Sequence, residues 1–161
     1  MSAGGESELV DLKARLFERQ VREVLAYAVG FPTDEKMARI CEEYQADPGL
    51  LFVGYLRGDQ VLACAALRPA GPDGAWLERL AVTPLERRRG LGRQLLWDLV
   101  HLSRLRWVEA ETDDDAVGFY RACGFEVAEL AGQPFERARY RVTLRVEGDS
   151  LAADHLAAPE R

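Results

Sequence analysis

The amino-acid sequence predicts a single α/β domain, and three observations lead to this prediction. The chain has 161 residues, which is enough for one hydrophobic core and too few for two full domains. Apolar residues make up 48% and charged residues 30%, a balance typical of globular proteins. Segments with strand and helix periodicity follow one another across residues 7–146, whereas residues 1–6 and 147–161 lack periodicity and are expected to be disordered tails.

Two amphipathic helices are expected in the first third of the chain. Apolar residues recur at helical spacing from Phe17 to Ala28, and Gly30 should end this first helix. Thr33 is expected to cap a second helix that ends at residue 47. The apolar stripe of the second helix comprises Met37, Ile40, Cys41 and Tyr44.

The rest of the chain alternates between expected strands and helices. Strand-forming residues dominate 50–56 and 61–67, which should form an antiparallel hairpin, and also 75–82, 107–112, 125–130 and 135–146. Helical periodicity begins at Gly90 and again at Asp113, and Gly124 should end the second of these helices.

The cysteines and histidines argue against a disulfide framework and against a metal site. Cys41, Cys64 and Cys123 form an odd set among apolar neighbours and are expected to be reduced core residues. His101 and His155 lack a second ligand at the spacing that metal sites use. We therefore expect no metal.

Net charge and hydropathy limit the kinds of partner that the protein is expected to have. The net charge of -6 argues against broad attraction to nucleic acid, although a local basic cluster could still bind one compact anion. No apolar run is long enough to cross a bilayer, and the first residues do not have the order of a secretory signal. The sequence thus predicts a cytoplasmic protein without a membrane or nucleic-acid partner, either a monomer or a homodimer.

An arginine-rich turn is the most informative segment. A strand is followed by Pro84, three arginines at 87–89, Gly90 and Gly92, and then a helix. Glycines let the backbone approach a ligand closely, and a helix start presents unpaired N–H groups to an anion. Arg93 adds a fourth guanidinium, a group well suited to phosphate oxygens. The spacing alone fits a pyrophosphate cradle and a solvated loop before a helix equally well.

Other anion-binding patterns match less well. A nucleoside-triphosphate loop needs Lys and then Ser or Thr after its second glycine, where this chain has Arg93 and Gln94. The dinucleotide fingerprint needs a third glycine where Leu95 stands, although Asp113 lies near the distance of a ribose-binding acid. A dinucleotide-binding protein therefore remains an alternative. RNA binding is disfavoured because no aromatic residues are interleaved with the arginines.

Two blocks of the sequence resemble the GNAT superfamily of acyl-CoA-dependent N-acetyltransferases, over about residues 50–125 and weakly to 146. The family pattern (Arg or Gln)-x-x-Gly-x-(Gly or Ala) after a strand is matched by residues 87–92. A second family block, Asn-x-x-Ala-x-x-(Phe or Leu)-Tyr followed by Gly-Phe, is matched by residues 113–120 and 124–125. Asp113 stands where the family usually has Asn, and a carboxylate cannot donate as the amide does.

The resemblance implies a fold, a cosubstrate and a set of site residues. The fold would be a mixed, twisted sheet splayed near its middle, with helices on both faces, and residues 9–12 are the candidate for its short first strand. Acetyl-CoA would be the cosubstrate, and Tyr120 would protonate its departing thiolate. The residues assigned to the acetyl-CoA site are Leu80, Ala81, Val82, Arg87, Arg88, Arg89, Gly90, Leu91, Gly92, Arg93, Asp113 and Phe119.

A general base for the acceptor amine is sought among three glutamates. Glu78 shares a strand face with Leu80 and Val82 and is the first choice. Glu109 and Glu111 are rivals, and a chain of waters could replace all three. The expected function is acetyl transfer to a primary amine of a small molecule or a peptide, by direct attack in a ternary complex. An acyl-CoA-binding regulatory module without turnover is the alternative.

Overall fold

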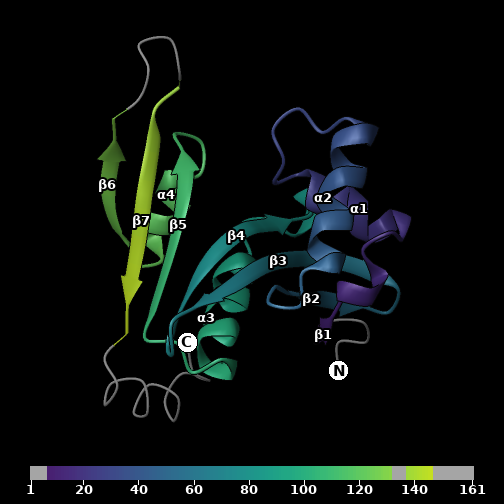
Figure 1. The fold of residues 1–161 in the computed structure, drawn as a ribbon, viewed down its shortest axis with the longest axis horizontal. Helices are drawn as coiled ribbons and strands as arrows, with labels where there is room; N and C mark the ends of the chain where they lie inside the picture. The colour runs from purple at the N-terminus through teal and green to yellow at the C-terminus, as the bar shows by residue number, and fades with distance from the viewer. Residues whose placement is uncertain (1–6, 132–136, 147–161) are drawn as a thin grey trace. The chain divides into compact units, whose positions relative to one another are not determined.

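The computed structural model describes residues 7–131 and 137–146 (Figure 1). The tails predicted at residues 1–6 and 147–161 lie outside the described residues, as do the first two residues of the strand predicted at 135–146. The strands are β1 (Glu8–Asp11), β2 (Leu51–Arg57), β3 (Gln60–Ala70), β4 (Gly74–Val82), β5 (Trp107–Asp113), β6 (Glu126–Leu130) and β7 (Arg139–Arg145). The helices are α1 (Arg19–Ala26), α2 (Asp34–Ala46), α3 (Leu91–Leu102) and α4 (Val117–Ala122), with 3₁₀ turns η1 (Lys13–Arg15) and η2 (Pro84–Glu86).

The described strands form one mixed sheet in the order β1-β2-β3-β4-β5-β7-β6. The pair β4–β5 is parallel, whereas β1–β2, β2–β3, β5–β7 and β6–β7 are antiparallel. The predicted α/β class, the mixed sheet, the short first strand and the 50–67 hairpin are therefore confirmed.

The ladder between β4 and β5 is short. In the described chain it pairs Gly74 with Trp107, Ala75 with Val108 and Trp76 with Glu109, while both strands continue beyond these pairs. A Cβ atom at Gly74 would lie 1.7 Å from the Trp107 ring, so only glycine allows this close approach. The pairs with β5 end at Trp76, and β4 continues to Val82.

The described residues form two compact units, one of residues up to 69 together with 77–97, the other of residues 70–76 together with those from 98 onward. In the first unit, α1 and α2 cover one face of β2 and β3, as Figure 1 shows. Thr33 caps α2 as predicted, because its Oγ1 accepts a hydrogen bond from the Lys36 N–H at 3.1 Å. All four residues of the predicted α2 stripe are buried.

The predicted bounds of α1 were wrong at both ends. Phe17 precedes the helix and is 45% exposed, because Leu12 and Leu16 fill the core from the turn around η1 instead. The helix begins at Arg19, and Tyr27 forms its C-cap before Ala28.

The second unit contains the antiparallel ladder of β5, β7 and β6, with α4 packed against β6 and β7. The helix predicted to begin at Asp113 begins instead at Val117, which corrects the sequence-based start. The Asp113 carboxylate accepts hydrogen bonds from the N–H groups of Asp115 and Ala116, at 3.0 and 3.2 Å, and so holds these residues in a turn. Gly124 ends the helix as predicted, at a φ of 96°.

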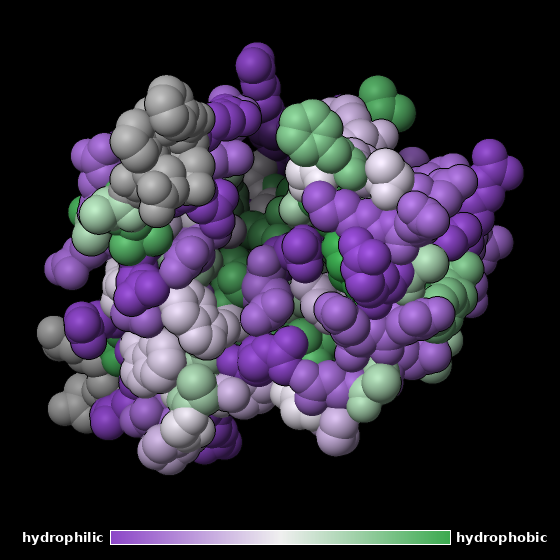
Figure 2. All heavy atoms as spheres, turned by 45° about the horizontal axis from the view of Figure 1, so that its top comes forward, coloured by the Kyte–Doolittle hydropathy of each residue, from purple (hydrophilic) through white to green (hydrophobic). Residues whose placement is uncertain are grey.

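The residues found in the core and on the surface are those expected from the composition. All three cysteines are buried thiols, as predicted. On the face drawn in Figure 2, hydrophilic side chains predominate and apolar side chains show as separate areas. Within the described residues, no helix has the length and apolar character needed to cross a membrane.

Candidate active site

The part of β4 beyond its ladder with β5 presents one face of alternating residues. Leu77 and Ala81 point into the core and are buried, whereas Glu78, Leu80 and Val82 are partly exposed. The predicted sharing of a face by Glu78, Leu80 and Val82 agrees with this alternation.

The segment after β4 turns sharply into α3. The Thr83 N–H donates to the Leu62 carbonyl at 2.9 Å, which fixes the end of β4 against β3, and η2 follows. Arg88 and Gly90 then adopt positive φ angles of 65° and 78°. A positive φ favours glycine, which explains Gly90, whereas Arg88 holds this conformation at a cost.

The start of α3 presents backbone donors at this turn. The hydrogen bond from the Gln94 N–H to the Gly90 carbonyl, 2.9 Å long, is the first of the helical ladder. The amides of Leu91, Gly92 and Arg93 precede it and therefore have no acceptor within the helix. Together with the helix dipole, they make this end of α3 suited to an anion. Gly92 is buried in this first turn.

The arginines of the turn have different contacts. Arg87 donates from Nε to the Val82 carbonyl at 2.9 Å, and its guanidinium lies 5.2 Å from the ring centre of Tyr27. Arg89 lies 3.6 Å from Glu86. The side chains of Arg88 and Arg93 are exposed.

Glu86 is a buried carboxylate that connects the arginine turn to β2. It is only 6% exposed, and both of its oxygens accept hydrogen bonds from Arg57 at the end of β2, at 3.1 and 3.4 Å. A buried carboxylate needs such a partner, so Arg57 and Glu86 hold the turn to the β2–β3 hairpin. No sequence pattern predicted this pair, because its members are separated by 29 residues.

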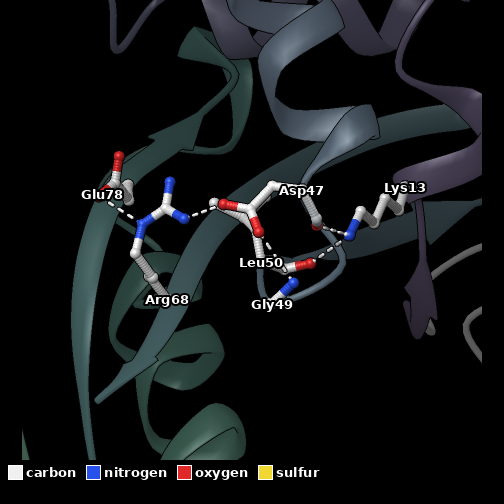
Figure 3. Close-up of polar contacts among 6 residues, drawn as sticks. All are labelled: Lys13, Asp47, Gly49, Leu50, Arg68 and Glu78. Carbon is white, nitrogen blue, oxygen red and sulfur yellow. Dashed lines mark hydrogen bonds and ion pairs between the residues drawn. The ribbon is translucent and has the colours of Figure 1, made fainter.

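Glu78 has a cationic neighbour on β3. Arg68 donates from Nε to Oε2 of Glu78 at 3.2 Å and from Nη1 to Oδ2 of Asp47, the C-cap of α2 (Figure 3). The second oxygen of Asp47 accepts from the Gly49 N–H at 2.9 Å, and Lys13 donates to the carbonyls of Asp47 and Leu50. Sequence reasoning missed Arg68 and Asp47 as neighbours of the candidate base.

Tyr120 lies in the second unit, on α4. It is 7% exposed, and its ring packs edge-on against Phe119 and Phe125, with ring centres 5.0 and 5.2 Å away. Burial raises the pKa of the Tyr120 hydroxyl, and the nearby Cys123 thiol adds to this rise. The hydroxyl therefore keeps its proton at neutral pH, the form that a proton donor requires.

The two rival glutamates are held in cross-strand pairs on one face of β5. Glu109 accepts a hydrogen bond from Thr143 at 3.1 Å, and Glu111 accepts one from Arg141 at 2.9 Å. In each case the partner is the residue directly opposite on β7. Such pairs are typical of ordinary sheet stabilisation.

The predicted site residues are divided between the two units. Glu78, Leu80–Val82 and the turn from Arg87 to Arg93 belong to the first unit, where they follow one another along a single strand and turn. Asp113, Phe119 and Tyr120 belong to the second unit, together with Glu109 and Glu111.

A family model described as the acetyltransferase (GNAT) family matches residues 15–125. A protein assigned to the GNAT family from Desulfovibrio desulfuricans is 26% identical, with a TM-score of 0.72 over 88% of this chain and 100% of that chain. The ribosomal-protein-S18-alanine N-acetyltransferase from Escherichia coli is 21% identical, with a TM-score of 0.66 over 88% of this chain and 95% of that one. A GNAT family acetyltransferase from Elizabethkingia anophelis, solved with acetyl-CoA bound, is 14% identical, with a TM-score of 0.63 over 88% of this chain and 99% of that one.

The similarities to the Escherichia coli and Elizabethkingia anophelis enzymes show that the protein has the fold of an acyl-group transferase. The chain belongs to the acetyltransferase (GNAT) family, whose members are acetyl-CoA-dependent N-acetyltransferases. The predicted resemblance and enzyme class are confirmed.

Proposed function

We propose that this protein transfers an acetyl group from acetyl-CoA to a primary amine by direct attack in a ternary complex. The proposal depends on one observation. The part of β4 that follows its pairs with β5 leads directly into a turn with positive φ angles and then into the start of α3. In this order, the strand backbone would meet the acyl and pantetheine groups of the ligand, and the helix amides and arginines would meet its pyrophosphate.

The pyrophosphate of acetyl-CoA would bind the amides at the start of α3, with Arg88 and Arg93 supplying charge. Both side chains are exposed at the turn, as a phosphate ligand requires. Arg87 and Arg89 would support the turn as well as the ligand, because each already contacts another part of it. The backbone of Leu80, Ala81 and Val82 would hold the pantetheine arm and the acetyl carbonyl. Asp113 and Phe119 complete the proposed cosubstrate set.

Two side chains would move protons in the proposed reaction. Glu78 would accept a proton from the acceptor amine, whose nitrogen then forms the new bond to the acetyl carbon as the thioester bond breaks. Tyr120 would donate its proton to the departing thiolate. Its buried, protonated hydroxyl supports this role. Glu109 and Glu111 remain rival candidates, and Glu78 is preferred because it lies on the strand that leads into the arginine turn and shares a face with Leu80 and Val82.

The proposal extends to the setting of the enzyme. The acceptor would be the primary amine of a small molecule or a peptide. No metal, membrane or nucleic acid would take part, and the enzyme would act in the cytoplasm as a monomer or a homodimer.

Two measurements test this function. Acetyl-CoA is expected to raise the melting temperature more than NAD or ATP at equal concentration, because a ligand that binds the folded state stabilises it by mass action. A panel of primary amines with acetyl-CoA is then expected to release the CoA thiol with at least one amine. Greater stabilisation by NAD would favour the dinucleotide alternative, and binding of acetyl-CoA without thiol release from any amine would favour the regulatory module.

A further inference from the structure

Arg68 lies between two carboxylates that come from different elements. It is on β3, Glu78 is on β4, and Asp47 is the C-cap of α2. Its Nε donates to Glu78 and its Nη1 donates to Asp47, so the two acids bind different nitrogens of one planar group (Figure 3). A planar guanidinium that is hydrogen-bonded through two of its nitrogens has little freedom to rotate.

Asp47 is itself held in place. One of its oxygens meets Arg68 and the other accepts from the Gly49 N–H at 2.9 Å, so its carboxylate cannot turn without losing a bond. Lys13 donates to the Asp47 carbonyl and, at 2.7 Å, to the Leu50 carbonyl, which fixes the backbone of the same turn. The hydrogen bond from Arg68, followed by that from Gly49, holds the pKa of Asp47 below its usual value. The carboxylate is therefore ionised at neutral pH and remains paired with Arg68.

A second contact joins the same two elements. Arg79, next to Glu78 on β4, donates from Nη1 to the Tyr44 hydroxyl on α2 at 2.6 Å. The last part of α2 is thus connected to two successive residues of β4, to Glu78 through Arg68 and to Arg79 through Tyr44. These contacts fix where Arg68 presents its Nε.

The charges of Asp47 and Arg68 balance each other beside Glu78, and this suits the proposed role of Glu78 as a base. A lone guanidinium beside Glu78 would hold the carboxylate in position but would also weaken it as a proton acceptor. Asp47 offsets the charge of Arg68, so the pair gives Glu78 a directed hydrogen bond with little net charge. Arg68 binds one oxygen of Glu78, while the other points away from the guanidinium (Figure 3).

Stability alone gives a weak reason for this arrangement. The side chains of Arg68, Asp47 and Glu78 are 38%, 32% and 31% exposed, and ion pairs at this exposure contribute little to folding. A small contribution to stability combined with a well-defined geometry is typical of residues that position another group.

From these contacts we infer that Arg68, held by Asp47, is a positioning residue that fixes the Glu78 carboxylate for proton transfer from the acceptor amine. This inference rests on the proposed role of Glu78 as the base. Arg68 touches neither the acetyl group nor the amine and acts through Glu78 alone.

The test is a double-mutant cycle on kcat, using the most active amine of the panel and the full-length enzyme. Arg68→Ala is expected to lower kcat by about 10- to 100-fold, the cost of a misplaced catalytic group, with the KM for acetyl-CoA within about twofold of the wild type. Arg68→Lys, which keeps the charge but loses the planar group whose separate nitrogens bond the two acids, should recover part of the rate. In the Glu78→Gln background, Arg68→Ala should lower kcat no further, because the group that it positions is already absent.

Controls separate the possible outcomes. Arg19→Ala removes an exposed ion pair with Glu23 on α1 and should leave kcat unchanged. If Arg68→Ala melts too low to assay, Asp47→Asn and Arg68→Lys complete the same cycle. Equal losses from Arg68→Ala in the wild-type and Glu78→Gln backgrounds would show a merely structural role and overturn the inference. A fully active Glu78→Gln variant would instead remove Glu78 as the base, while an inactive Glu78→Gln variant beside an unaffected Arg68→Ala variant would remove only the positioning role.

Discussion

Arg87 donates a hydrogen bond from Nε to the Val82 carbonyl oxygen, 2.9 Å away, and so ties the first residue of the arginine turn to the last residue of β4. The strand and the turn would contact opposite ends of the same ligand in the proposed function. Because this bond joins them directly, it would help to hold the two ends of the proposed site at a set distance before any ligand binds.

Gly92→Asp is expected to abolish binding of acetyl-CoA. Gly92 is buried in the first turn of α3, where the new side chain would need space and would add negative charge beside the proposed pyrophosphate position. Calorimetric titration with acetyl-CoA measures the loss, and circular dichroism reports whether the variant is folded. A folded variant with wild-type affinity would show that the pyrophosphate binds elsewhere.

Tyr120→Phe is expected to lower turnover while preserving the fold and the affinity for acetyl-CoA. The variant loses one hydroxyl and keeps the ring that packs against Phe119 and Phe125. Loss of a positioned general acid costs about 10²- to 10⁴-fold in rate, and we expect the lower end because a thiol of pKa about 8.5 is already a tolerable leaving group. Turnover at saturating acetyl-CoA measures this effect. Unchanged turnover, at a pH where chemistry limits the rate, would leave Tyr120 with a packing role only.

Asp47→Asn is expected to lower the melting temperature near neutral pH by a small amount, because the pair with Arg68 is partly exposed, and not to lower it in acid. The pKa of Asp47 is depressed in the folded state, chiefly by the hydrogen bond from Arg68. A carboxylate with a depressed pKa stabilises the folded state above its unfolded pKa of about 3.9, and this contribution is lost as the pH falls through the folded pKa. Asparagine keeps one acceptor for the Gly49 N–H but loses both the charge and the second acceptor that Arg68 uses.

Melting curves of wild type and Asp47→Asn should therefore differ at about pH 7 and converge towards about pH 3. Glu126→Gln, which changes an exposed carboxylate on β6, serves as the comparison. A difference between wild type and Asp47→Asn that is constant across this range would exclude linkage through the Asp47 proton.

Gly74→Ala is expected to destabilise the protein by about 1–3 kcal/mol, the usual cost of forcing an extra methyl group into a packed site. The new Cβ would lie 1.7 Å from the Trp107 ring, in the ladder between β4 and β5. Gly118→Ala on α4 is the matched control, because a Cβ there would meet nothing within 4 Å. Denaturant unfolding compares the two variants. Equal stability of both would mean that Trp107 moves aside at no cost.

Local signals predicted most of the elements. The Thr33 cap, the turn from Pro84 to Gly90 and the stop at Gly124 each depend on a few adjacent residues, and each is present in the structure. The start of α4 was misplaced because the Asp113 carboxylate accepts hydrogen bonds from the amides of its own turn. A run of acidic residues can form such a turn as well as the first turn of a helix, so the sequence does not distinguish the two.

The surroundings of the candidate base could not be predicted in this way. Arg68 is separated from Glu78 by 10 residues and from Asp47 by 21, and no sequence spacing encodes a contact between three different elements. Asp47 was interpreted only as the end of a helix. Its second role depends on the register that pairs Leu51 with Leu67, the residue before Arg68, and this register follows from the whole β2–β3 ladder rather than from any short motif.

The pair of Arg57 and Glu86 also determines how the enzyme can be labelled. Gly58 and Asp59 form the exposed tip of the β2–β3 hairpin, and a Cβ at Gly58 would meet nothing within 4 Å, so an epitope tag or a fluorophore would ordinarily be inserted there. Arg57, the residue just before this tip, holds the buried Glu86 under the arginine turn. An insertion that displaced Arg57 would remove both hydrogen bonds that it donates to the buried Glu86, which would then depend on Arg89, 3.6 Å away, an arginine that the proposed pyrophosphate site also uses. A label at this hairpin would therefore alter the affinity that it was meant to observe.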